Sequence, residues 1–200
     1  MIDMAVQEKR IGVLGMQGAV AEHLKMLGEL PHVKPFIVRT QQELDEADGL
    51  ILPGGESTAM TKLLDYFKLR QPLAAKIKQG LPVWGTCAGM ILLADRIESA
   101  HGDKPILAAM DITVRRNAYG SQLDSFEADV PVPAVKKEGT VPLVFIRAPF
   151  VVAAGSDVDI LAKVNGNIVA VRQGSMLATA FHPELTDDLS FHRYFADMVQ

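Results

Sequence analysis

Residues 81–89 read Leu-Pro-Val-Trp-Gly-Thr-Cys-Ala-Gly, an apolar run that ends in a Gly-x-Cys-x-Gly turn. This order is typical of the thiol version of the nucleophile elbow, in which a sharp turn between a strand and a helix presents the reactive atom at the top of a sheet. The two glycines permit the tight turn, and free N–H groups at the start of the helix favour a thiolate. Cys87 is the only cysteine of the chain, so it forms no internal disulfide. It is therefore either a nucleophile or a buried filler, which free cysteines often are.

The residues before this turn alternate between apolar runs and segments with helical spacing. Strands separated by helices of this length indicate βαβ units, in which a parallel sheet is covered by helices on both faces. We expect a short helical turn at Glu43-Leu44, helices at residues 19–30, 57–69 and 72–79, and strands at residues 10–15, 33–39, 49–53 and 81–85.

The second half of the chain changes character, because short β-branched runs are separated by turn signals. Asn165-Gly166 is a strong hairpin signal, and Gln173-Gly174 is a second candidate turn. A helix with an acidic start is expected at about residues 186–198. The sequence therefore predicts one α/β domain over residues 1–200, with a mostly parallel central sheet, flanking helices and an antiparallel extension. The strands of that extension are expected at residues 111–114, 141–146, 160–164, 168–171 and 177–181.

Composition and charge exclude several classes of function. The chain is 48% hydrophobic and 22% charged, as soluble globular proteins are. A net charge of −4 without a long basic run gives no support for binding to nucleic acid or to a membrane surface. Residues 81–94 are too short and too broken to span a bilayer, and residues 1–9 do not resemble a signal peptide. A single free cysteine fits a reducing compartment, so we expect the cytoplasm.

Three of the predicted strands are followed by unusual residues. Residues 15–18 (Gly-Met-Gln-Gly) follow the first strand, residues 53–58 (Pro-Gly-Gly-Glu-Ser-Thr) follow the third, and Cys87 follows the fourth. Ligands of open α/β sheets bind beyond the carboxyl ends of the strands, so these positions should converge. The backbone of Gly54-Gly55 can aim N–H groups at a developing oxyanion, or it can simply form a turn in which Ser57 is the helix N-cap.

A cysteine nucleophile needs a base, and His182 is the best placed candidate. Pro183 pushes His182 towards extended geometry, where Glu184 would lie on the same side and could fix the tautomer of the imidazole. The alternative is that Pro183-Glu184 only starts the last helix and His182 is a surface residue. A zinc deaminase is excluded because the chain has no Cys-x-x-Cys, and we expect neither a metal nor a cofactor. The five histidines are His23, His32, His101, His182 and His192.

These motifs together resemble the class I (triad) glutamine amidotransferases, and more narrowly the glutaminase subunits of pyridoxal 5′-phosphate synthases. The matching motifs occur in order along nearly the whole chain, and as a set they are very specific. They lie at residues 12–20, 52–58, 85–89, 116–120, 124–127, 145–149 and 181–186. The resemblance implies a single flavodoxin-like domain that hydrolyses L-glutamine to L-glutamate and ammonia.

The resemblance also implies a role for each site residue. Cys87 would attack the side-chain amide, and His182 would protonate the leaving ammonia and then activate water against the thioester. Glu184 would orient His182, while the backbone N–H groups of Gly55 and Ala88 would hold the oxyanion. The glutamine pocket would be lined by Gly55, Glu56, Ser57, Arg116, Ile146 and Arg147. A zwitterionic substrate needs a cation for its carboxylate, but which arginine supplies it stays open.

The implied partner is a separate (β/α)₈-barrel synthase subunit, which takes up the ammonia within a large hetero-oligomer. Glutaminases of this family are poorly active until they dock on that subunit. Gln17 lies in a Gln-Gly motif that is associated with the docked interface and with organising the oxyanion hole. One departure is Ser121, where a basic residue is more usual, and it affects a local surface contact only.

Three other functions are compatible with parts of this sequence. The glutaminase half of another amidotransferase, such as that of histidine biosynthesis, is disfavoured by the motifs at residues 54–58 and 116–120. A cysteine hydrolase or peptidase of related fold would have no reason to combine the glutamine-pocket residues. A non-catalytic binding module would have no need for Cys87, His182 and Glu184 together.

Overall fold

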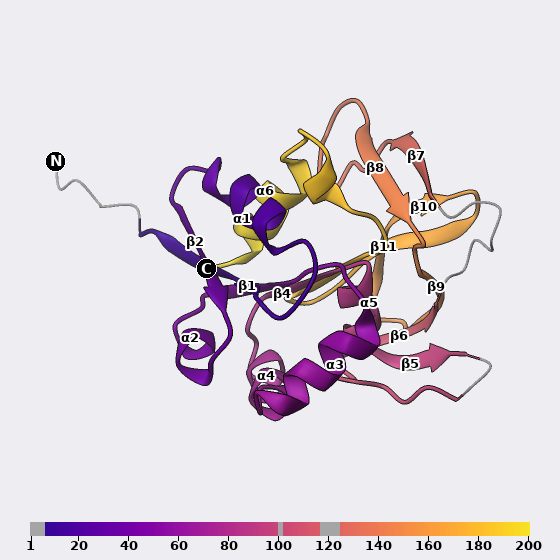
Figure 1. The fold of residues 1–200 in the computed structure, drawn as a ribbon. Coiled ribbons are helices and arrows are strands. Elements are labelled where there is room, and N and C mark those ends of the chain that lie inside the picture. Colours follow the sequence, from indigo (N-terminus) through magenta and orange to yellow (C-terminus); the bar gives the residue numbers. More distant parts are fainter. Residues whose placement is uncertain (1–6, 100–101, 117–124) are drawn as a thin grey trace, which may run out of the picture.

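One sheet of ten strands organises the chain in a computed structural model that describes residues 7–99, 102–116 and 125–200. The strands lie side by side in the order β2-β1-β3-β4-β12-β11-β9-β6-β5, and β10 pairs with β11 (Figure 1). A second sheet consists of β7 and β8. The large sheet contains β1 (Lys9–Leu14), β2 (Val33–Val38), β3 (Gly49–Leu52), β4 (Val83–Thr86), β5 (Ala94–Glu98), β6 (Met110–Arg115), β9 (Phe150–Ala154), β10 (Asp159–Val164), β11 (Asn167–Gln173) and β12 (Met176–Thr179), and the small sheet contains β7 (Ser125–Val130) and β8 (Val141–Ile146).

Helices cover both faces of the sheet, as the βαβ pattern predicts. In Figure 1, α1 and α6 lie on one face, and α3, α4 and α5 lie on the other. The 3₁₀ turn η1 (Pro183–Leu185) leads from the last strand towards α6. The helices are α1 (Val20–Gly28), α2 (Gln41–Asp45), α3 (Ser57–Tyr66), α4 (Arg70–Lys78), α5 (Ala88–Leu93) and α6 (Ser190–Met198).

The first half of the large sheet is parallel. β1 pairs in parallel with β2 and β3, β3 with β4, and β4 with β12. This order, 2-1-3-4 followed by a fifth parallel strand, is that of flavodoxin-like folds. β3 and β4 are buried along their whole length, as strands covered on both faces must be. The expected fold class is therefore confirmed for this half.

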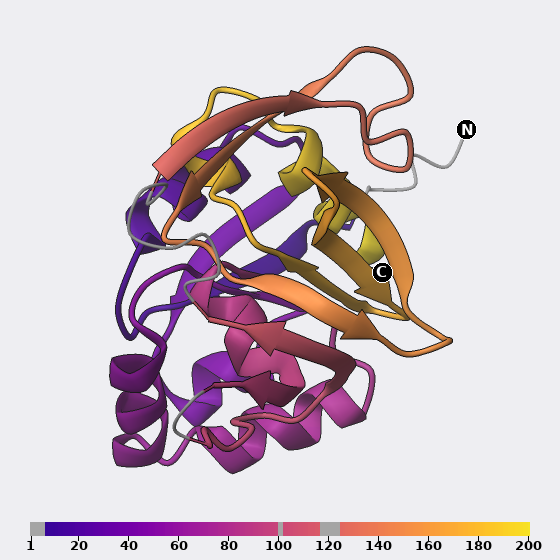
Figure 2. The ribbon, with the colours of Figure 1, turned by 90° about the vertical axis from the view of Figure 1, so that its right-hand side faces the viewer.

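The second half is mainly antiparallel. β11 pairs antiparallel with β9, β10 and β12, and β6 with β9, while β5 and β6 are parallel. Figure 2 shows the orange strands of this half together, beside the indigo and purple strands of the parallel half. The predicted hairpin at Asn165-Gly166 is confirmed: φ is 50° at Asn165 and 81° at Gly166, as a type I′ turn requires.

The core is anchored by Trp84 at the centre of the parallel half. Its indole is fully buried, and it packs against Phe191 and Phe195 of α6 with ring centroids 6.2 and 5.7 Å apart. Its Nε1 donates to Thr179 Oγ1 at 3.0 Å. The C-terminal helix is thereby fixed over the same strands that carry the cysteine turn. No helix among the described residues is long and apolar enough to cross a bilayer.

Several sequence expectations need correction. The last helix begins at Ser190, not at residue 186, because residues 183–185 form η1 and Asp188 Oδ1 accepts the Ser190 N–H. Ser57 is not the N-cap of α3, since Glu56 occupies that position. Three strands in the described part of the chain were not predicted, namely β5, β7 and β9. His101, Ser121, the motif residues 117–120 and residue 124 lie outside the described residues.

Candidate active site

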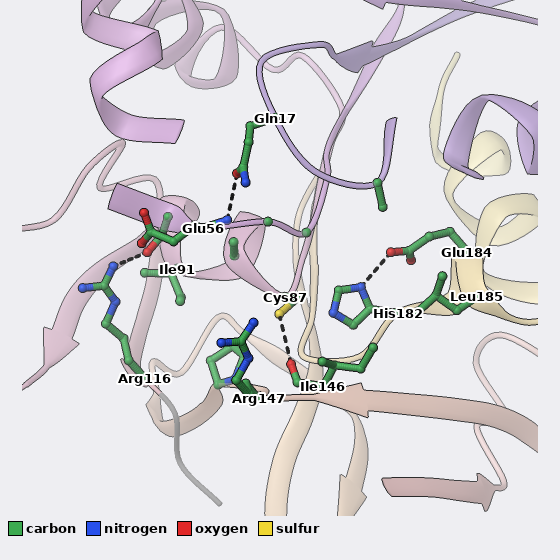
Figure 3. A pocket seen from close by; sticks show the side chains of 16 residues that line it. Gln17, Glu56, Cys87, Ile91, Arg116, Ile146, Arg147, His182, Glu184 and Leu185 are labelled. Carbon is green, nitrogen blue, oxygen red and sulfur yellow. Dashed lines mark hydrogen bonds and ion pairs between the residues drawn. The ribbon is translucent and has the colours of Figure 1, made fainter. Parts of the chain in front are cut away.

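The unusual residues after the strands line one pocket, as expected from their positions. Gln17 follows β1, the loop at 53–56 follows β3, Cys87 follows β4, and His182 follows β12 (Figure 3). The cavity measures about 560 Å³, within the usual size of small-molecule sites. Its lining includes every proposed site residue: Gln17, Gly55, Glu56, Ser57, Cys87, Ala88, Arg116, Ile146, Arg147, His182 and Glu184.

Cys87 sits at a strained turn between β4 and α5. Its backbone has φ 49° and ψ −104°, a conformation that residues with a side chain rarely adopt. Close packing holds the turn, because a Cβ on Gly89 would lie 2.1 Å from the Leu52 carbonyl oxygen and one on Gly85 would lie 2.4 Å from that of Gly89. The thiol is 4.0 Å from the Ile146 carbonyl oxygen and faces the pocket. The predicted elbow geometry is confirmed.

His182 is held between the cysteine and a buried carboxylate. The backbone N–H of His182 donates to the Val144 carbonyl at 2.8 Å, and the ring Nδ1 lies 2.7 Å from Glu184 Oε1. Because a carboxylate only accepts, Nδ1 carries the proton of this bond, and Nε2 remains for the thiol. The expected pairing of His182 with Glu184 is present, but the expected reason is wrong. Glu184 approaches through the 3₁₀ turn η1 rather than through an extended segment.

Gly54 leaves room for the imidazole beside the cysteine. A Cβ at this position would lie 2.5 Å from His182 Cε1 and 3.4 Å from Cys87 Cβ. Both side chains therefore occupy the space in front of Gly54, and no larger residue fits there without moving one of them.

The surroundings of His182 favour its protonated form. Burial acts to lower its pKa, but interactions with Cys87 and Glu184 outweigh this and raise the pKa to about 10. At neutral pH the ring is therefore an imidazolium, with its second proton on Nε2 facing Cys87. This Nε2 proton is available to a leaving group in the pocket.

Gln17 braces the loop after β3. Its Oε1 accepts the Glu56 N–H at 2.8 Å, and a Cβ on Gly55 would lie 2.5 Å from the same oxygen. Ala19 N–H also donates to the Gly54 carbonyl at 3.1 Å. The loop that would supply one oxyanion donor is thus held by the loop that contains Gln17.

Glu56 caps α3 and borders the pocket. Its carboxylate accepts the N–H groups of Thr58 at 2.9 Å and Ala59 at 2.7 Å. Burial acts to raise its pKa, but these hydrogen bonds prevail and lower it. Ser57, which was expected to cap the helix, instead accepts a hydrogen bond from Arg116 through its hydroxyl.

The two arginines of the pocket differ in their partners. Arg116 is committed, since it contacts Ser57 and pairs with Asp103 at 2.7 Å. Arg147 is exposed, adopts φ 44°, and has no hydrogen bond or ion pair among the described residues. Arg147 and Cys87 both line the pocket (Figure 3). Of the two, Arg147 has the cation that is free to meet an anionic group.

Two buried histidines near the site were not assigned a role from the sequence. His23 of α1 and His192 of α6 are both fully buried, and His23 Nε2 lies 3.5 Å from Glu184 Oε2. His23 lies in the first turn of α1, soon after the Gln17 loop, but nothing in the neighbouring sequence predicts its contact with Glu184. Within the described part of the chain, no group of three or more His, Cys, Asp or Glu side chains could hold a metal ion.

Known proteins match this chain over almost its whole length. The model of the SNO glutamine amidotransferase family matches residues 13–200. A protein of Ruminiclostridium cellulolyticum, pyridoxal 5′-phosphate synthase subunit PdxT, is 54% identical over 191 residues, which cover 96% of this chain and 100% of the relative. A protein of the same name from Clostridium kluyveri is 53% identical over 186 residues, which cover 93% and 97%.

A solved structure described as a glutamine amidotransferase has a TM-score of 0.87 and 39% identity to this chain, and the match covers 94% of this chain and 98% of that one. A putative GMP synthase subunit from Thermoplasma acidophilum, at 18% identity and a TM-score of 0.66, shares the fold alone. The family resemblance drawn from the motifs is thereby confirmed, and the chain belongs to the SNO glutamine amidotransferase family.

Proposed function

We propose that this protein hydrolyses L-glutamine to L-glutamate and ammonia, and that it supplies the ammonia to a synthase subunit that makes pyridoxal 5′-phosphate. One observation supports the proposal above all others. Cys87, His182 and Glu184 stand in line at the pocket, as a nucleophile, a base and an orienting carboxylate must. The two PdxT relatives named above, at 54% and 53% identity, support the choice of product and partner.

In the first half of the reaction, Cys87 Sγ forms a bond to the side-chain amide carbon of glutamine. The amide oxygen becomes an oxyanion, for which the backbone N–H groups of Gly55 and Ala88 are the proposed donors. Ala88 is the first residue of α5, so its N–H has no acceptor within the helix. The C–N bond then breaks, and the proton on His182 Nε2 moves to the leaving nitrogen, which departs as ammonia.

In the second half, the thioester between Cys87 and the glutamyl group is hydrolysed. Neutral His182 takes a proton from water, and the resulting hydroxide attacks the thioester carbon. The C–S bond breaks, glutamate leaves, and the thiolate is restored beside protonated His182. Glu184 holds Nδ1 at 2.7 Å throughout, which fixes the ring and stabilises its charge.

The remaining pocket residues would recognise the amino-acid end of glutamine. We assign its carboxylate to Arg147, because that guanidinium has no partner among the described residues. Arg116 would act by holding Ser57, which it contacts. Glu56 would face the substrate ammonium while it caps α3. Ile146 would form part of the apolar wall.

The proposed partner is a (β/α)₈-barrel synthase subunit in a large hetero-oligomer. Ile146 and Leu185, with 36% and 47% of their surfaces exposed, border the pocket and suit a docking face. Gln17 would couple docking to the oxyanion loop, because it binds Glu56 N–H. We propose residues 1–200 as a single domain and the cytoplasm as its location, which the free Cys87 thiol supports.

A comparison of wild type with the Cys87→Ala variant tests this function. Both proteins would be incubated with glutamine and the purified synthase subunit, and glutamate would be measured. We expect wild-type turnover and a loss of at least about 10³-fold in the variant. The folded state of the variant would be checked by thermal unfolding. Glutamate formation at the wild-type rate by Cys87→Ala would refute the assigned nucleophile.

A further inference from the structure

A row of buried polar side chains continues behind Glu184, away from the pocket. It consists of His23 from α1, His192 from α6 and Thr86 at the end of β4, and all three are fully buried. His23 Nδ1 lies 2.9 Å from His192 Nε2, and His23 Nε2 lies 3.3 Å from Thr86 Oγ1. Buried polar groups need partners, so the direction of each of these hydrogen bonds can be worked out.

His23 of this row lies near Glu184 Oε2, an oxygen that has no other hydrogen-bond donor among the described residues. His182 takes up Glu184 Oε1, whereas Oε2 is buried and has no hydrogen bond to any described residue. His23 Nε2 lies 3.5 Å from that oxygen. A buried carboxylate oxygen without a donor is destabilising, and hydrogen bonds of catalytic groups are often long until substrate binds.

The position of the protons follows from the other end of the row. Burial, with help from His192 and His182, keeps the pKa of His23 well below its usual value, and burial lowers that of His192 to about 3. Both rings are therefore neutral, and each carries one N–H. His192 Nδ1 is buried without a hydrogen bond to a described residue. A buried N–H is rarely left without an acceptor, so the proton of His192 belongs on Nε2.

The remaining assignments are then fixed. His192 Nε2–H donates to His23 Nδ1, which must accept, so His23 carries its proton on Nε2. His23 Nε2 lies 3.3 Å from Thr86 Oγ1 and 3.5 Å from Glu184 Oε2. We propose that His23 is a positioning residue, whose Nε2–H binds Glu184 Oε2 and holds the carboxylate in the orientation that His182 needs, with His192 fixing the tautomer of His23.

Under this proposal each oxygen of Glu184 is held by one imidazole. His182 binds Oε1 and His23 binds Oε2, so the carboxylate cannot rotate about its last bond. A fixed carboxylate keeps the His182 ring turned towards Cys87. The functional part of this inference rests on the proposed function, whereas the tautomers of the two histidines do not depend on it.

Nuclear magnetic resonance of the ¹⁵N-histidine-labelled protein tests the tautomers directly. Long-range ¹H–¹⁵N spectra distinguish a nitrogen that carries a proton from one that does not. The His23 and His192 signals would be assigned by their loss in single variants. We expect both rings to be neutral and protonated on Nε2 at neutral pH. A His23 ring protonated on Nδ1 would overturn the proposal, even in a protein that hydrolyses glutamine.

Kinetics then test the positioning role. His23→Leu removes the donor, while His23→Gln places an amide N–H near the position of Nε2, and Met26→Leu is a matched control at another buried residue of α1. Glutamine hydrolysis would be measured in the complex with the synthase subunit. We expect His23→Leu to lower kcat by about 10- to 100-fold with little change in KM. His23→Gln should stay within about threefold of wild type, and Met26→Leu should match it.

Two kinetic outcomes would overturn the role of His23. One is a His23→Leu variant with wild-type kcat, and the other is a folded His23→Gln variant as impaired as His23→Leu. Thermal unfolding of each variant identifies those that fail to fold, and in that case the His23 tautomer of the wild type decides. A wild-type protein that does not hydrolyse glutamine would contradict the proposed function and leave the tautomer test valid.

Discussion

At the scale of single residues, the site depends on positions where a side chain would not fit. Cys87 keeps a backbone conformation that is unfavourable by about 1–3 kcal/mol, and the packing of Gly85 and Gly89 maintains it. Gly54 is the clearest case, because the missing Cβ is what lets His182 stand next to Cys87.

A Gly54→Ala substitution should therefore impair catalysis more than stability. The new methyl group would meet His182 Cε1 at 2.5 Å and displace the ring from the cysteine. We expect kcat for glutamine to fall at least about tenfold, since small misplacements of a catalytic group have large effects. The control is Gly28→Ala at the end of α1, where the nearest atom is 4.0 Å away. Equal, wild-type kcat values in both variants would contradict this reading of Gly54.

Arg116 has an ion pair and a hydrogen bond and Arg147 has neither among the described residues, so their substitutions should affect substrate binding differently. Arg147→Ala should raise KM for glutamine by about 10-fold or more with a smaller change in kcat, because it removes a charge-assisted hydrogen bond. Arg147→Lys should recover part of the loss, since the charge remains. Arg116→Ala should disturb Ser57 and α3 as well, so its thermal stability should also fall. A KM that is unchanged in Arg147→Ala would show that another group holds the carboxylate.

The raised pKa of His182 predicts how stability changes with pH. Folding raises the pKa from 6.5 to about 10, so the folded protein binds this proton more tightly. The resulting stabilisation is complete below pH 6.5 and is lost as the pH rises through about 10. Denaturant unfolding of wild type and His182→Gln at a series of pH values measures it as a difference that shrinks as the pH rises. The loss of stability with rising pH should be weaker in Cys87→Ala, because Cys87 contributes to the raised pKa of His182. A stability difference between wild type and His182→Gln that does not change with pH would contradict the raised pKa of His182.

At the scale of elements, the start of α3 shows how one side chain serves both fold and site. Glu56→Ala removes the acceptor of two N–H groups and should lower the free energy of unfolding by about 1 kcal/mol. Folding lowers the pKa of Glu56, so its contribution is present above the unfolded value of 4.5 and is lost as the pH falls through the folded value. Glu56→Gln keeps an acceptor and should be affected less. Denaturant unfolding of wild type, Glu56→Ala and Glu56→Gln measures this: the difference between wild type and Glu56→Ala should be present near neutral pH and shrink in acid. A difference that is the same at both pH values would contradict the role of the Glu56 carboxylate.

The elements also show what the sequence could and could not predict. The buried parallel strands and the Asn165-Gly166 hairpin were predictable, because apolar runs and a turn that needs positive φ are local signals. β7 was missed although its six residues Ser125–Val130 alternate polar and apolar, which is itself a strand signal. The strands of this half were expected at β-branched runs, and β7 has a single β-branched residue, Val130. The N-cap of α3 was misassigned because Glu56 and Ser57 are both competent acceptors, and only the path of the loop chooses between them.

At the scale of the whole molecule, strand order brings together the parts of the site. β4 and β12 are neighbours and parallel, with Thr86 opposite Thr179, so Cys87 and the segment that carries His182 leave the sheet side by side. Cys87 N–H donates to the Thr179 carbonyl at 2.8 Å across this junction. The sequence suggested both residues from their local motifs. It could not place His23 and His192 behind them, because that contact depends on how α1 and α6 pack together.

Ammonia release in the presence and absence of the purified synthase subunit is the most direct test of the proposed function. Wild type, with Cys87→Ala as the control, would be assayed at saturating glutamine. We expect a low rate from the free protein, a rise of at least about tenfold when the synthase is added, and no activity from the variant in either case. A wild-type rate that the synthase leaves unchanged would contradict the assignment, even if some basal hydrolysis remained.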